Sequence, residues 1–315
     1  DILPERINLL KNKYQASGYE DIRKFLANPE IELVSVATRS PDHTRHALMA
    51  LEAGKYVLLE KPVALNTDDA LQLRRAAAKY PGKLFCRHNR RFEPAFQHVR
   101  EIMASGLLGE VYEIKLCRHN YQRRDDWQSI GACGGGQLNN WGPHLIDHGL
   151  QLMGAPLKEV WSNLKRIAAV GDAEDHMKII MRGENDRIID IEISGGVALP
   201  SPTYTVYGIR GTLICENEQD IRLRYLANDS EPPVLSANPE TPPLNGGFGN
   251  VAGLKWRRET IMVEPSAGCD TSHIWKHLYA AIRKGIEFPV KLEEALEVVR
   301  VTSLIRAASR FQTEN

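Results

Sequence analysis

The sequence predicts two structural units: an α/β unit with a parallel sheet, then an α+β unit with a large, mostly antiparallel open sheet flanked by helices. Three observations support this prediction. The chain has 315 residues, enough for about two domains of ~150 residues each. Strand-like and helix-like patterns alternate over residues 1–88. From Val111 onward, apolar and polar residues alternate in short runs separated by turns, which is typical of antiparallel strands.

The parallel sheet is predicted from three strands, at residues 31–38, 56–60 and 84–88. The first, IELVSVAT, has few polar residues, as expected when helices cover both faces of a sheet. Helices are expected at residues 4–14, 19–27, 40–54 and 67–80. Strands joined by crossover helices form parallel sheets, which bind ligands beyond the carboxyl ends of their strands.

Polar residues follow the first two strands. They are Thr38, Arg39, Ser40 and His43 after the first strand, and Glu60 and Lys61 with Pro62 after the second. A Lys-Pro pair at a strand's carboxyl end places an ammonium group at the ligand crevice, next to a proline that can form a cis bond. The alternative is an ordinary solvated lysine in a turn.

Residues 134–154, GGGQLNNWGPHLIDHGLQLMG, form the most informative stretch. Three leading glycines allow a ligand to approach the backbone closely. The run that follows has a helical period. We expect its polar residues to share one face: Asn140, His144 and Asp147 or His148.

Pro143 indicates that a helix begins close to Gly142 or that an earlier helix bends there. His144 near such a helix start is a candidate general base, because imidazole titrates close to neutral pH. Two alternatives stay open. His144 could be a core histidine, or Asn140, His144 and His148 could form a metal-binding face.

A polar segment precedes the glycines and is expected to border the same crevice. Its candidate substrate contacts are Tyr121, Arg124, Asp126 and Trp127. Mixed hydrogen-bonding groups beside an indole suit a polyhydroxylated ring, whose hydroxyls need partners and whose C–H face can rest on an aromatic ring. The alternative is a mobile charged loop.

The second unit is predicted to contain seven strands and, besides the helix that follows the glycines, two more helices. The strands are expected at 111–119, 160–166, 176–181, 187–194, 203–207, 212–216 and 221–226, and the helices at 271–284 and 292–311. One face of such a sheet is free for a second subunit, so we expect a homodimer or homotetramer. Residues 228–253, rich in proline and glycine, are expected to form a long loop that serves as a lid or an oligomer arm, or is disordered.

Two motifs together resemble the Gfo/Idh/MocA family of nicotinamide-dependent oxidoreductases. ATRSPDHTRHALMALEAGKYVLLEKP (37–62) is similar to the family's strand, EAGK and EKP pattern, and GGGQLNNWGPHLID (134–147) is similar to its GGGxLxDxGxHxxD motif. NRRFEPAF (89–96) and LLGEVYEI (107–114) also resemble the family's connection into its second domain. The family acts mainly on sugars, cyclitols and their derivatives.

The resemblance implies a Rossmann-type domain at 1–88, with a first βαβ unit and its GxGxxG fingerprint upstream of Asp1, and a substrate and oligomerisation domain at 89–315. It implies catalysis by Lys61, His144 and Asn140, with His144 also touching the substrate. The implied cofactor contacts are Asp1, Thr38, Arg39, Ser40, His43, Glu60, Lys61 and Asn89. Asp1 matches the acid that binds the ribose hydroxyls, which favours NAD over NADP. The family's motif aspartate is Asn140 here, and an amide cannot carry charge or take a proton.

The composition of the chain limits the classes of binding partner that we expect. Forty basic and forty acidic residues balance, so neither nucleic acid nor an anionic membrane is expected as a partner. We see no signal peptide and no apolar run of the ~20 residues that span a bilayer. Five scattered cysteines indicate reduced thiols, and together these features predict a cytoplasmic protein without a bound metal.

The leading hypothesis is reversible hydride transfer between NAD and a secondary alcohol of a sugar or cyclitol. Lys61 would stabilise charge on the reacting oxygen and His144 would take the hydroxyl proton. One alternative is a non-catalytic sugar-binding protein on the same scaffold. Another is redox-assisted cleavage of a glycoside, and a metal-dependent hydrolase is a further alternative.

Overall fold

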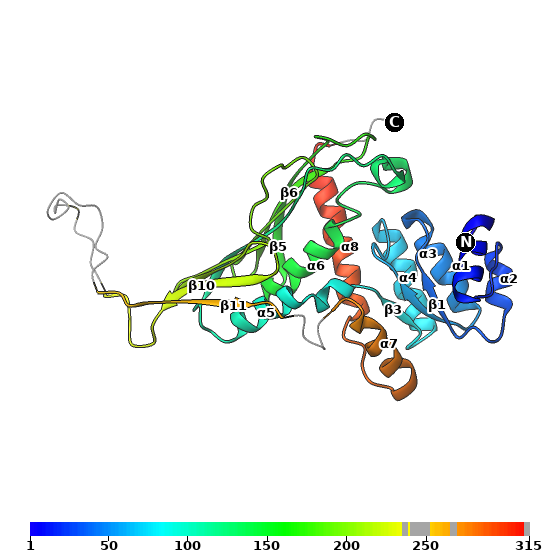
Figure 1. Cartoon of the computed structure of the whole chain (residues 1–315), viewed down its shortest axis with the longest axis horizontal. Helices are drawn as coiled ribbons and strands as arrows, with labels where there is room; N and C mark the ends of the chain where they lie inside the picture. Colours follow the sequence, from blue (N-terminus) through cyan, green and yellow to red (C-terminus); the bar gives the residue numbers. More distant parts are fainter. Residues whose placement is uncertain (235–238, 240–252, 265–269, 312–315) are drawn as a thin grey trace.

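The computed structural model describes residues 1–234, 239, 253–264 and 270–311. It contains a three-stranded sheet near the amino terminus and an eight-stranded sheet formed by the rest of the chain. In Figure 1, the long red helix α8 (Leu292–Ala308) lies between the two sheets, and the hairpin of β10 and β11 extends away from the body.

The first sheet has the order β1-β2-β3 and is parallel throughout, as predicted. Its strands are β1 (Leu33–Val36), β2 (Tyr56–Leu59) and β3 (Leu84–Cys86), each shorter than its predicted span. The helices in this unit are α1 (Pro4–Tyr14), α2 (Ile22–Ala27), α3 (His43–Glu52) and α4 (Thr67–Lys79). Residues of β2 are buried on both faces, which explains its unbroken apolar run.

The second sheet has the order β11-β10-β9-β8-β4-β7-β6-β5. Its strands are β4 (Val111–His119), β5 (Leu157–Lys165), β6 (His176–Gly183), β7 (Ile188–Ser194), β8 (Tyr204–Gly208), β9 (Gly211–Cys215), β10 (Asp220–Leu226) and β11 (Trp256–Met262). Every pairing is antiparallel except that of β4 with β7. The predicted combination of a Rossmann-like parallel sheet and a large, mostly antiparallel sheet with helices is therefore confirmed.

Four further helices complete the fold: α5 (Pro94–Ala104), α6 (Gly142–Met153), α7 (His273–Lys284) and α8. Helices α6 and α8 pack together, and they contact strands of the large sheet. Along α8, Val301 and Ile305 belong to the core under the large sheet, whereas Ala295 and Leu296 belong to the core around the small sheet. Helix α7 also packs on the small-sheet core. The division of the chain at residue 88 stays a prediction, although α7 and α8, which follow that residue, both contribute to the small-sheet core and α8 joins the two cores.

Two elements differ from the sequence analysis. Helix α5 and strand β11 were not predicted. Six of the seven residues of β11 are exposed, so it lacks the apolar alternation that identifies a half-buried strand. Much of the loop predicted at 228–253 lies outside the described residues. Among the helices described, none is both long and apolar enough to traverse a bilayer.

Candidate active site

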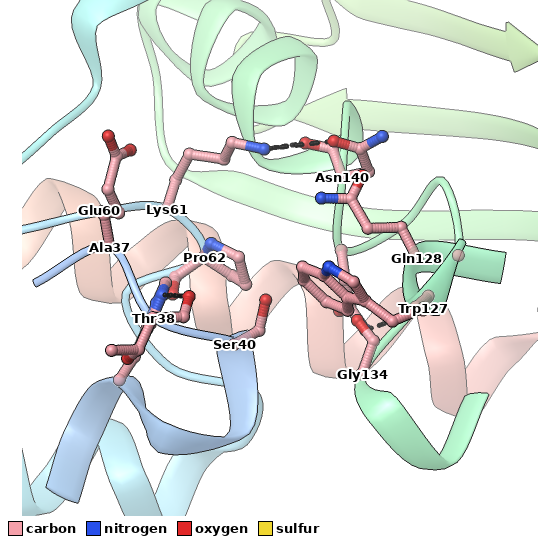
Figure 2. Close-up of a pocket in the computed structure, with 14 residues that line it drawn as sticks. Ala37, Thr38, Ser40, Glu60, Lys61, Pro62, Trp127, Gln128, Gly134 and Asn140 are labelled. Atoms are coloured by element: carbon pink, nitrogen blue, oxygen red, sulfur yellow. Dashed lines mark hydrogen bonds between the residues drawn. The ribbon is translucent and has the colours of Figure 1, made fainter. Parts of the chain in front are cut away.

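A polar cavity of about 200 Å³ lies where the carboxyl ends of β1 and β2 meet the glycine-led segment. Figure 2 shows Ala37, Thr38 and Ser40 on one side, Trp127, Gln128 and Gly134 on the other, and Lys61 reaching across. The complete lining is Ala37, Thr38, Ser40, His43, Glu60, Lys61, Pro62, Trp127, Gln128, Gly134, Gly135, Gly136, Asn139 and Asn140. Segments far apart in sequence thus form one pocket at the sheet edge where α/β proteins bind ligands.

Lys61 connects the two motifs. Its Nζ donates to the main-chain oxygen of Asn140 at 2.8 Å and is 3.3 Å from the side-chain Oδ1 of the same residue. Burial lowers the pKa of Lys61 to about 8, opposed by Glu60 and assisted by the positive charges of Arg90 and Arg124. The peptide bond between Lys61 and Pro62 is cis.

His43 holds the two strand ends together. Its Nδ1 lies 2.7 Å from the carbonyl oxygen of Pro62, and its Nε2 lies 2.9 Å from the carbonyl oxygen of Thr38. The buried ring therefore shapes the pocket wall through main-chain contacts on both sides. Glu60, on the same wall, pairs with Arg87.

Close packing requires glycine at positions 135 and 136. A Cβ on Gly135 would lie 2.6 Å from the carbonyl oxygen of Gln128, and a Cβ on Gly136 would lie 2.3 Å from Oε1 of Glu174. Gly136 also has a φ of +99°, a conformation that favours glycine. The carboxylate of Glu174 accepts a hydrogen bond from the main-chain N–H of Leu138, so this loop is tied to the large-sheet domain.

Helix α6 begins at Gly142, with Pro143 in its first turn. The prediction that Asn140 shares a helical face with His144 is wrong, because Asn140 precedes the helix and reaches Lys61 from the loop. His144 is 6% exposed, and its ring meets that of Trp141 edge-on with centroids 5.8 Å apart. Burial, then the charges of Lys61 and Arg90, hold the pKa of His144 well below its usual 6.5.

Asp147 and His148 have other partners. Asp147 receives two hydrogen bonds from the guanidinium of Arg91, at 2.7 and 2.5 Å. The Nε2 of His148 is 3.0 Å from the carbonyl oxygen of Arg90, and its ring stacks on Phe96. In the part of the chain that the structure describes, no three His, Cys, Asp or Glu side chains are grouped to hold a metal ion.

The polar segment before the glycines reaches the site in part. Trp127 lines the main cavity, and Arg124 borders a small adjoining cavity of about 20 Å³ that also touches Asn140. Asp126 pairs with Arg124 at 2.6 Å and caps a short 3-10 helix, Trp127–Ser129. Tyr121 is 65% exposed and forms an isolated bridge with Gly196 instead.

The remaining candidates are not in the lining of the described cavity. Arg39 stands between the lining residues Thr38 and Ser40, Asn89 begins a short 3-10 helix (Asn89–Phe92) three residues after β3, and Asp1 is the first residue of the sequence. Asp1 accepts a hydrogen bond from the main-chain N–H of Leu3 and lies 3.6 Å from Arg6. His144 does not line the cavity either, although it follows the loop that does. Sequence reasoning missed Gln128 and Asn139, and the only signal for them was their position beside Trp127 and Asn140.

Two family models match this chain. Residues 1–88 match the model described as an oxidoreductase family with an NAD-binding Rossmann fold, and residues 96–214 match the model of the GFO/IDH/MocA C-terminal domain. Together the two matches span more than half of the chain.

Proteins similar to this chain are named as dehydrogenases or as NAD-binding. The chain is 25% identical to scyllo-inositol 2-dehydrogenase (NADP(+)) IolW of Bacillus subtilis, over 98% of this chain and 86% of that protein. It is 32% identical to D-glucoside 3-dehydrogenase of Escherichia coli over 47% of this chain and 43% of that protein. The structure is similar to an NAD-binding protein from Listeria innocua, with a TM-score of 0.81, 25% identity, and coverage of 98% of this chain and 88% of that chain. This chain therefore belongs to the Gfo/Idh/MocA family of oxidoreductases, which use a nicotinamide cofactor.

Proposed function

We propose that the protein reversibly oxidises a secondary alcohol of a sugar or cyclitol, with NAD as the hydride acceptor. The observation that carries this proposal is the contact between Lys61 and Asn140, which joins the end of β2 to the glycine-led segment in one polar cavity. In this proposal Lys61, His144 and Asn140 surround the reacting oxygen.

Lys61 acts as a hydrogen-bond donor. Its ammonium group already points at two oxygen atoms of Asn140, so a substrate oxygen entering beside them would find a donor in place. A positioned cation stabilises the negative charge that develops on that oxygen as the proton leaves. The role needs the protonated amine, which dominates below pH 8 because burial lowers the pKa of Lys61 to about 8.

His144 takes the hydroxyl proton. Its ring is neutral at physiological pH, because burial and the nearby charge of Lys61 lower its pKa, and a neutral imidazole can accept a proton. Asn140 supplies an amide in place of the family's aspartate, so it orients a substrate hydroxyl or Lys61 without exchanging a proton. Trp127 provides an apolar surface for the sugar's C–H face, and Arg124 a donor at its rim.

The residues present fit one end of a nicotinamide dinucleotide. The cavity is smaller than the roughly 300–1000 Å³ of a pocket for a drug-sized ligand, which suits a single ring. Thr38 and Ser40 offer hydroxyls and Glu60 a carboxylate at the strand ends, where a ribose and a carboxamide find partners. When bound, the nicotinamide would take up the hydride. In this proposal, Asp1 binds the ribose hydroxyls of the cofactor, which favours NAD. The similar protein IolW is named for NADP(+) instead.

Glycoside cleavage by transient oxidation is the second candidate. It would begin with the same oxidation, on a glucoside, the substrate class in the name of D-glucoside 3-dehydrogenase, to which this chain is similar. Products of a cleaved glycosidic bond without net reduction of the cofactor would identify this reaction.

We also propose a homodimer or homotetramer that forms through the outer face of the large sheet. Trp161 on β5 is 55% exposed and Tyr112 on β4 is half-exposed, on the side opposite the core residues of the same strands. Exposed aromatic residues are enriched at subunit interfaces.

The test is a spectrophotometric screen for reduced nicotinamide with NAD and with NADP. The panel contains scyllo-inositol, myo-inositol, D-glucose and methyl glucosides, and products are analysed in parallel. The expected result is cofactor reduction by at least one polyol, lost in Lys61→Met and in His144→Ala. Normal turnover in both variants would refute the assigned site, and tight cofactor binding without turnover on any compound would favour a binding protein.

A further inference from the structure

His88 is a buried imidazole that the proposed mechanism does not use. It follows β3 at the carboxyl edge of the small sheet and is 2% exposed. Among the described residues, neither of its ring nitrogens has a hydrogen-bond partner. Burying such a group without partners costs free energy, so its presence calls for a functional explanation.

The surroundings of His88 are charged on several sides. Its Nδ1 lies 3.8 Å from Oδ2 of Asp147 on α6. Arg91 holds that carboxylate with two hydrogen bonds, and its third nitrogen reaches Glu294 on α8 at 2.5 Å. Lys61 adds a positive charge from the loop after β2.

His144 lies close to the same group. It precedes Asp147 by three residues on α6, a spacing that places two side chains on one face of a helix. The charge of a protonated His88 would lower the pKa of His144, as does that of Lys61, so the three residues interact electrostatically. His88 and the proposed general base therefore share Asp147 as a neighbour: His88 lies 3.8 Å from its carboxylate, and His144 is three residues away from it on α6.

We propose that His88 is a positioning residue that receives, from His144, the proton removed from the substrate hydroxyl, and that Asp147 stabilises the resulting imidazolium. This inference rests on the proposed function. The hydroxyl O–H bond breaks and an N–H bond forms on His144; the oxidised nicotinamide, when bound, would accept the hydride. That proton then moves to Nε2 of His88, directly or through one water, and His144 becomes neutral again.

The geometry assigns the tautomer. Nδ1 faces a carboxylate that can only accept, so Nδ1 carries the hydrogen and Nε2 keeps a lone pair. Burial lowers the pKa of His88 and Asp147 opposes this, which leaves the resting ring neutral and able to accept. The distance of 3.8 Å is longer than a hydrogen bond, as is common for catalytic contacts before substrate binds.

This proton transfer from His144 to His88, which we call the relay, supplies a proton acceptor that the site otherwise lacks. Asn140 stands where the family motif has an aspartate, and it cannot take a proton. His144 is a poor place for the proton to remain, because its buried ring lies near Lys61 and Arg90. A second imidazole next to an ionised carboxylate provides the missing acceptor.

The first test needs no substrate. In protein with ¹⁵N-labelled histidine, the ring signals of His88 are assigned by their loss in His88→Phe and followed against pH. We expect the neutral Nδ1–H tautomer at pH 7. A neutral Nε2–H tautomer, or a ring that is already charged at pH 7, would overturn the proposal.

The second test uses kinetics with the polyol panel. His88→Phe keeps a ring of similar size and breaks no hydrogen bond that the described residues make, so we expect a folded protein with an unchanged or higher melting temperature. We expect kcat to fall about 10- to 100-fold with little change in KM, within or below the ~10²–10⁴-fold supplied by a direct acid–base group. Imidazole added to His88→Ala is expected to restore part of the rate. His98→Phe on α5 is the matched control.

The outcomes separate the two proposals. If Lys61→Met abolishes turnover while His88→Phe keeps the wild-type kcat and pH profile, the proposed function stands and the relay is refuted. If neither variant loses activity, the active site itself is wrong. A loss of kcat in His88→Phe that is accompanied by an equal loss of folded protein would assign His88 to structure alone.

Discussion

Replacing Lys61 with Met should abolish turnover without weakening the fold. Methionine has a similar length, fills the same space and removes the ammonium that we place on the reacting oxygen. Loss of one preorganised donor at a developing oxyanion typically lowers kcat about 10²–10³-fold, which is ~2.7–4 kcal/mol of transition-state stabilisation. We expect a fall of at least this size, because Lys61 also carries a full charge.

The effect on stability follows from the burial of the ammonium. A fall of the pKa from 10.5 to about 8 corresponds to about 3 kcal/mol against the buried cation at neutral pH. Removing the charge recovers part of this, but leaves two oxygens of Asn140 without their donor, at a cost of about 1–3 kcal/mol. The two effects are of similar size, so the free energy of unfolding should change by less than about 2 kcal/mol at pH 7.

The sign of the pH dependence provides a further check. Between pH 8 and 10.5 the unfolded chain binds a proton at Lys61 and the folded chain does not, so wild-type stability should rise with pH relative to Lys61→Met in this window. Activity should do the opposite and decline above pH 8, as the ammonium is lost. Lys61→Arg, which stays charged, should lack this alkaline decline.

The assays are steady-state cofactor reduction from pH 6 to pH 10 and urea unfolding over the same range. Wild-type-like kcat in Lys61→Met would refute the placement of Lys61 at the reacting oxygen. An activity that rises as Lys61 deprotonates would also contradict its role as a charged donor, since it would indicate a neutral amine acting as the base. A variant that fails to fold would contradict the stability estimate.

Three other predictions concern the framework of the site. Arg91→Met leaves the carboxylate of Asp147 buried without its guanidinium partner, so the free energy of unfolding in urea should fall by about 3–5 kcal/mol. A fall of less than about 1 kcal/mol would contradict the buried pair. Gly136→Ala places a methyl group 2.3 Å from Glu174 at a φ of +99°. The free energy of unfolding should fall by about 1–3 kcal/mol, and turnover should fall with it. An unchanged melting curve would show that the loop can move aside. Trp161→Glu on the outer sheet face should weaken self-association by about 2 kcal/mol or ~30-fold, read by light scattering at several concentrations, and an unchanged oligomer would place the interface elsewhere.

The parallel sheet was predictable because its signals are local. An unbroken apolar run marks a strand covered on both faces, as in β2, and the Ser-Pro-Asp sequence marks the turn into α3. Strand β11 was not predictable in the same way. It is held by its register with β10 rather than by an apolar face, and a pairing partner cannot be recognised from one strand alone.

Several candidate site residues share one cavity, but their arrangement in it was not predictable from the sequence. Lys61, Asn140 and Trp127 line one cavity, as expected from two motifs and a polar segment. The roles of individual side chains depended on their neighbours. Asn140 was placed on the helix by its spacing, yet Pro143 starts the helix later and leaves Asn140 in the loop, where its main-chain oxygen meets Lys61.

The sequence by itself determined the class of fold, the order of most of its elements and the family to which the chain belongs, because each of these depends on patterns between residues that are close along the chain. Only the tertiary structure decided which charges share a buried space. His88 and Asp147 are 59 residues apart and gave no joint signal, yet their side chains lie 3.8 Å apart. Burial and charge proximity depend on the whole packed molecule, and these set the protonation states on which the proposed chemistry depends.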